Sequence, residues 1–148
     1  MSERYSPWAH VQGLGDVVVA YDDLEHADAY WEPEQRVILL DRHLNQRERR
    51  ACLAHELAHV DRGDEGCGDG PDGGRLLVRQ ERAATQLAAR RLIGLDELAD
   101  ALAWSLDADE AAELLHVDER TARARLDGLT DAEKAYIDRR LGARDGAA

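Results

Sequence analysis

The segment Arg49–Val60, RRACLAHELAHV, constrains how the rest of this 148-residue chain can fold. Leu53, Leu57 and Val60 recur at helical spacing and predict the apolar stripe of a helix that packs into a core. The residues between them are small, which suits a crowded and buried helix: Ala51, Cys52, Ala54 and Ala58. A buried helix at this place requires the neighbouring segments to cover it.

The flanking sequence defines the ends of this helix and the position of a second one. Asn45 followed by Glu48 has the pattern of a capping box, so the helix is predicted over Gln46–Arg62. The segment Asp61–Gly74 is rich in Gly and Asp and lacks periodicity, which predicts a flexible loop that serves as a flap over a cleft. A second long helix is predicted over Arg75–Ile93.

His55 and His59 lie four residues apart, hence one turn apart on the same helix face. Two imidazoles at this spacing can hold one zinc ion, and Glu56 stands beside the metal as a base for water. The alternative is a pair of surface histidines on a polar helix. The apolar stripe places these histidines near the interior, where they need partners, and the HELAH segment is therefore predicted to form a metal centre.

A catalytic zinc site needs a third protein ligand, and Glu81 is the first candidate. Leu77, Glu81, Ala84 and Ala88 form the predicted core-facing stripe of the second long helix. A carboxylate on an apolar face is costly unless it is paired or binds a metal. The alternative for Glu81 is a salt bridge, with Arg50 or Arg79 as its partner.

Other side chains near the motif remain possible contributors. The competing third ligands are the acidic residues that follow the motif, namely Asp61, Asp64 and Glu65. Cys52 could approach the metal, although a small buried cysteine is the favoured interpretation. Three residues could each stabilise an oxyanion, and the sequence does not choose between them: Tyr21, Tyr30 and His43.

The N-terminal third is predicted to form a small sheet. Pro7, after the N-cap Ser6, begins a short helix that ends near Gly13. Asp16–Tyr21 is predicted to be a buried strand, and two further strands flank a turn, over Ala27–Trp31 and Arg36–Leu40. The expected fold is α+β, with an antiparallel or mixed three-stranded sheet packed on the HExxH helix and the second long helix.

The C-terminal third is predicted to be a region of short helices. Their expected N-caps are Asp96, Asp109, Asp118 and Thr130, with Thr130 part of a second capping box. Gly142 is expected to close the last helix. The predicted organisation is a core over residues 1–95, a helical region over 96–142 and a disordered tail over 143–148.

Composition narrows the class of partner and the compartment. The formal net charge of -12 repels phosphate backbones and anionic lipids, so direct nucleic-acid or membrane binding is not expected. We find no signal-peptide pattern, no apolar run of membrane-spanning length, and two cysteines, which do not make a disulfide framework. A cytoplasmic protein is predicted, and its Arg-rich, Lys-poor composition hints at a bacterial or phage gene.

The segment Arg49–Val60 resembles the active-site helix of the ImmA/IrrE family of metallopeptidases. The segment Glu81–Gly94, ERAATQLAARRLIG, is similar to the second signature of that family, and Glu81 falls on its third zinc ligand. Thr85, Leu87, Arg91 and Gly94 depart from the signature. The resemblance implies a cytoplasmic, gluzincin-like zinc endopeptidase that cleaves a repressor containing a helix-turn-helix domain, in phage, mobile-element or stress regulation.

The resemblance also implies a small helical region after the peptidase core. Here Asp109–Leu115 and Asp118–Leu129, joined at His116-Val117, resemble a helix-turn-helix. Arg120, Arg123 and Arg125 would contact DNA in one interpretation. The acidic residues around them favour the other, a helical pair that docks on the peptidase core or on the substrate. Two alternatives to the peptidase remain: a non-catalytic transcriptional regulator or metal sensor, and a metal-free interaction protein such as an antitoxin.

Overall fold

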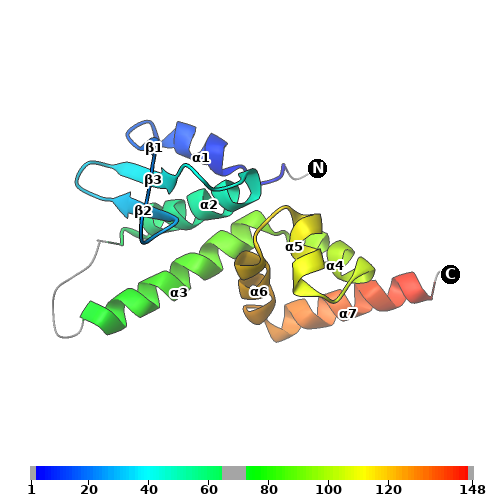
Figure 1. The fold of residues 1–148 in the computed structure, drawn as a ribbon. Coiled ribbons are helices and arrows are strands. Elements are labelled where there is room, and N and C mark those ends of the chain that lie inside the picture. The colour runs from blue at the N-terminus through cyan, green and yellow to red at the C-terminus, as the bar shows by residue number, and fades with distance from the viewer. Residues whose placement is uncertain (1–2, 65–72, 147–148) are drawn as a thin grey trace. The chain divides into compact units, whose positions relative to one another are not determined.

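The computed structural model describes residues 3–64 and 73–146. Within them the chain forms a three-stranded sheet and seven helices (Figure 1), and the α+β prediction is confirmed. The chain divides into two compact units, Met1–Leu92 and Ile93–Ala148. None of the described helices combines the length and the apolarity that crossing a bilayer requires.

The sheet is mixed, which is one of the two arrangements that the sequence predicted. Its strands are β1 (Val18–Asp22), β2 (Ala29–Glu32) and β3 (Val37–Asp41), in the order β1-β3-β2. β1 runs parallel to β3, and β2 runs antiparallel to it. The predicted hairpin therefore forms, and β2 becomes an edge strand.

Local hydrogen bonds explain where the first two helices begin. In α1 (Pro7–Leu14) the Ala9 N–H donates to the Ser6 hydroxyl, as predicted. The helix ends at Leu14, one residue beyond Gly13, and its C-cap is Gly15, whose φ is 70°. A left-handed backbone of this kind favours glycine. α2 (Gln46–Arg62) has the predicted bounds, and its capping box is complete.

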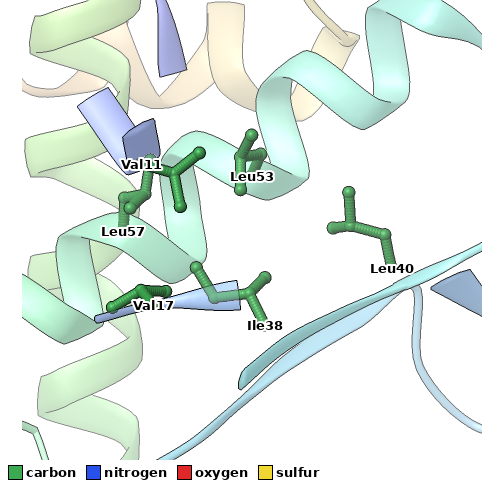
Figure 2. Close-up of a cluster of buried hydrophobic side chains, with 6 residues drawn as sticks. All are labelled: Val11, Val17, Ile38, Leu40, Leu53 and Leu57. Carbon is green, nitrogen blue, oxygen red and sulfur yellow. The ribbon is translucent and has the colours of Figure 1, made fainter. Parts of the chain in front are cut away.

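The core of the first unit holds α2 against one face of the sheet. Leu53 and Leu57 of α2 meet Ile38 and Leu40 of β3, and Val11 of α1 and Val17 complete the cluster (Figure 2). Leu53 and Leu57 therefore anchor α2 to the sheet, and His55 and His59 lie on the neighbouring face of the same helix.

α3 (Gly73–Leu92) packs against α2 through small side chains. Ala84 and Ala88 are buried as predicted, together with Ala89 and Leu92. Leu77 is 37% exposed, so the prediction that the core-facing stripe begins there is wrong. Alanines in the second half of α3 allow the two helices to approach closely, which brings Glu81 near the histidines of α2.

A polar network joins Tyr5 and His10, at the N-terminal end of the chain, to the C-terminal ends of α2 and α3. Asp61 Oδ2 lies 2.7 Å from an Arg91 nitrogen and 3.2 Å from His10 Nε2. His10 Nδ1 is 2.7 Å from the hydroxyl of Tyr5, whose pKa is raised mainly by burial. Arg91 departs from the family signature that the sequence resembles, and the network gives this arginine its partner.

Removing either member of the Asp61–Arg91 pair is expected to destabilise the protein. We expect Asp61→Ala and Arg91→Leu each to lower the free energy of unfolding by about 1–3 kcal/mol, because each strands a half-buried charge. The double variant should lose less than the sum of the two. Urea unfolding of the four proteins measures this coupling, and strictly additive losses would show that the pair contributes nothing.

The second unit consists of α4 (Leu95–Trp104), α5 (Ala108–Leu115), α6 (Glu119–Asp127) and α7 (Asp131–Asp145). The predicted caps at Asp118 and Thr130 are confirmed. The predictions for Asp96 and Asp109 are wrong, since both lie in first turns, after N-caps at Gly94 and Asp107. An acidic residue in the first turn is favoured by the helix dipole as well, so composition did not separate the two positions.

α7 runs beyond the end predicted at Gly142. Residues 143–145 are helical, and the cap is Gly146, so the predicted disordered tail is wrong over these residues. A glycine within a helix costs only about 1 kcal/mol, and Arg144 pairs with Asp100 of α4 at 2.7 Å. Contacts with α4 thus carry the helix past Gly142. Residues 147–148 lie outside the described part.

Candidate metal centre

Three side chains from two helices converge on one point. His59 Nε2 lies 2.8 Å from Glu81 Oε1, and His55 Nε2 lies 3.1 Å from Glu81 Oε2. The two Nε2 atoms are 3.1 Å apart. α2 supplies both histidines and α3 supplies the glutamate, so the close α2–α3 packing assembles the group.

The geometry fits a single bound cation. Zinc lies about 2.0–2.2 Å from nitrogen and oxygen ligands, so two tetrahedral ligands are about 3.3 Å apart. The separations of 2.8, 3.1 and 3.1 Å are somewhat shorter, and the two imidazoles face different oxygens of Glu81. Two imidazole nitrogens that face each other at this distance share at most one hydrogen, whereas a cation between them and the carboxylate satisfies all three. This donor set suits a metal site.

Glu56 lies next to this group and is buried, at 6% exposure. Burial is the main cause that raises the pKa of Glu56 to about 7, and the charge of Glu81 adds to the rise. His59 and a backbone hydrogen bond from Trp31 act in the opposite direction. The predicted base is therefore buried beside the ligand group, and a backbone hydrogen bond links it to Trp31 of β2.

Both imidazoles are held from their far side. His59 Nδ1 lies 2.9 Å from Asp64 Oδ2, and the same oxygen accepts a hydrogen bond from Arg62 Nε at 2.9 Å. His55 Nδ1 lies 3.4 Å from the Thr85 hydroxyl. These contacts leave each Nε2 directed at the shared point, an arrangement typical of metal-binding histidines.

Of the described candidates for the third ligand, Glu81 faces the shared point, whereas Asp61 and Asp64 are engaged elsewhere. Asp64 contacts the far nitrogen of His59 and not the shared point, and Asp61 is engaged by His10 and Arg91. Each carboxylate oxygen of Glu81 faces an imidazole of α2. This arrangement favours Glu81 as the third ligand over the alternative of a salt bridge to arginine. Glu65 and most of the predicted flap lie outside the described residues.

Cys52 and the three oxyanion candidates do not join the group. Cys52 is partly buried against the core cluster. Tyr21 lies under Arg49, near the start of α2, and Tyr30 alternates with the inward-facing Trp31, so it points to the other face of the sheet. His43 bonds Asp23 at the exposed ends of β1 and β3.

Sequence reasoning missed Asp64 and Thr85 as partners of the histidines. Gly63 offered a signal for Asp64, because a glycine just after a helix predicts a left-handed turn that carries the next residue back over the last turn. Thr85 follows Glu81 by four residues on the same helix face. The spacing alone could have placed Thr85 beside the site.

Comparison with known families is consistent with this site. The model of a peptidase family, M78, described as the IrrE N-terminal-like domain, matches residues 16–127, about three quarters of the chain. The match includes the whole sheet, both long helices and the first three helices of the second unit. No curated protein matches the chain.

Proposed function

This chain belongs to the M78 peptidase family of IrrE N-terminal-like domains, and we propose that it is a zinc-dependent endopeptidase of the bacterial or phage cytoplasm. The family indicates a metallopeptidase. The observation that carries the finer proposal is the convergence of His55, His59 and Glu81 beside a buried Glu56. This arrangement would supply three ligands to a zinc ion and a base beside it.

The proposed roles follow from these positions. His55, His59 and Glu81 would hold Zn²⁺, which when bound polarises a carbonyl group and lowers the pKa of water to about 7. Glu56 would take a proton from the attacking water as it adds to the scissile carbonyl carbon. Glu56 would then return the proton to the amide nitrogen, so that the carbon–nitrogen bond breaks with an amine as leaving group.

A protein substrate would bind along β2. Among the described strands β2 is an edge, and its Trp31 backbone bonds Glu56. An extended segment that pairs with this edge would therefore pass directly beside the base. We propose that the substrate is a DNA-binding repressor with a helix-turn-helix domain, as the resemblance to the ImmA/IrrE family implies.

The contacts of α6 support a protein-docking role for the second unit over DNA binding. Arg125 is buried, donating to the Ile93 carbonyl and to Glu133, and Arg123 is paired with Glu119. Asp118 caps the N-terminus of α6, where a phosphate would otherwise bind. Of the three arginines that would contact DNA in one interpretation of the sequence, Arg123 and Arg125 are engaged within the unit, which weakens the transcriptional-regulator alternative.

Metal analysis of protein purified without a histidine tag tests the proposal. We expect about one zinc per chain after incubation with zinc and removal of the excess. The loaded protein should cleave a repressor encoded beside its own gene, and a chelator should stop the cleavage. Failure to retain zinc would rule out the peptidase. Retained zinc together with salt-dependent binding to specific DNA, and without cleavage, would favour the regulator.

A further inference from the structure

We infer that Asp64 is a positioning residue for the metal centre: its carboxylate orients His59 so that Nε2 of this imidazole faces the metal. The inference rests on the proposed zinc site and adds a residue that supplies no ligand atom. Asp64 Oδ2 lies 2.9 Å from His59 Nδ1, and both side chains are about nine-tenths buried. A buried carboxylate this close holds Nδ1 as a donor and leaves Nε2 free to bind metal.

The backbone places Asp64 through the way in which α2 ends. Gly63 is left-handed, with φ 69°, and its N–H donates to the Val60 carbonyl. The Asp64 N–H donates to the His59 carbonyl at 3.1 Å, which completes a Schellman turn. In such turns the residue after the glycine commonly makes an apolar contact with the residue five positions earlier. Here that contact is polar, between Asp64 and His59.

A second contact fixes the carboxylate itself. Arg62 Nε donates to the same Asp64 oxygen at 2.9 Å, so the backbone and a neighbouring cation both restrain the Asp64 side chain. The Thr85 hydroxyl faces His55 Nδ1 at 3.4 Å, so this contact is longer and its partner is neutral. The contact between Asp64 and His59 is shorter, buried and made by a charged group.

The test measures zinc affinity of the full chain by competition with a chromophoric chelator. We expect Asp64→Ala to weaken zinc binding by about 10–100-fold. Asp64→Asn keeps an oxygen that can accept from Nδ1–H, so it should recover part of the loss. Thr85→Val should weaken zinc binding less than Asp64→Ala. Asp127→Asn, which makes the same change at an exposed position, should bind zinc like the wild type.

Thermal unfolding without metal separates positioning from folding. If Asp64→Ala does not fold, Asp64→Asn decides the matter, because it preserves the size and the acceptor. Asp64 variants that bind zinc as tightly as the wild type would overturn the inference and leave the proposed peptidase intact. A wild-type protein that binds no zinc would instead remove the proposed function. Weaker zinc binding by variants that are still folded at the temperature of the titration is the expected result.

Discussion

Replacing Glu56 with glutamine is expected to slow peptide-bond hydrolysis by about 10²–10⁴-fold, the range that general acid–base catalysis contributes, and to leave zinc binding unchanged. Glutamine has the shape of glutamate and can still accept the Trp31 backbone hydrogen bond, but it cannot take a proton from water. An uncharged amide also costs less to bury than a carboxylate. The variant should therefore fold, bind zinc and fail to catalyse.

The measurement compares initial rates of repressor cleavage by zinc-loaded proteins. Glu113→Gln is a matched control, because Glu113 is exposed on α5 and undergoes the same chemical change. We expect this control to cleave at the wild-type rate. Cleavage by Glu56→Gln at the wild-type rate would mean that the proton is transferred by another group, and the mechanism proposed for Glu56 would be wrong.

Features set by local sequence were predicted well. The capping boxes at Asn45 and Thr130 form as expected, because each depends on side chains within three residues of the backbone they satisfy. The two histidines of α2 share a face because the period of a helix requires it. The burial of Leu53 and Leu57 follows from the same period, and it is this burial that orients the predicted ligands.

Features set by distant contacts were not predictable in the same way. The order β1-β3-β2 depends on which strands meet across the chain, and alternation within Val18–Asp22 does not encode its neighbour. The continuation of α7 past Gly142 depends on α4, which lies forty residues earlier in the chain. Likewise the support of His59 depends on the left-handed turn at Gly63, which places Asp64.

Replacing Glu81 with glutamine tests its role as a metal ligand. We expect this change to weaken zinc binding by more than about 100-fold, which is beyond the range for residues that contact only a ligand. A neutral amide oxygen is a poor substitute for a carboxylate ligand beside two imidazoles. Cleavage should be lost together with the metal. The stability of the metal-free protein should change by less than about 1 kcal/mol, because the Glu81 side chain is 44% exposed and its pairs are solvent-screened.

This pattern distinguishes a ligand from a structural ion pair. If Glu81 merely neutralised His55 and His59, the glutamine variant would bind zinc like the wild type, and the main effect would appear in urea unfolding of the metal-free protein. As a ligand, Glu81 changes zinc affinity and leaves metal-free unfolding nearly constant. Glu56→Gln should instead keep full zinc affinity and cleave about 10²–10⁴-fold more slowly than the wild type. The pair of variants therefore separates holding the metal from using it, and an equal loss of zinc in both would contradict the assignment of Glu56 as a base that stands beside the metal.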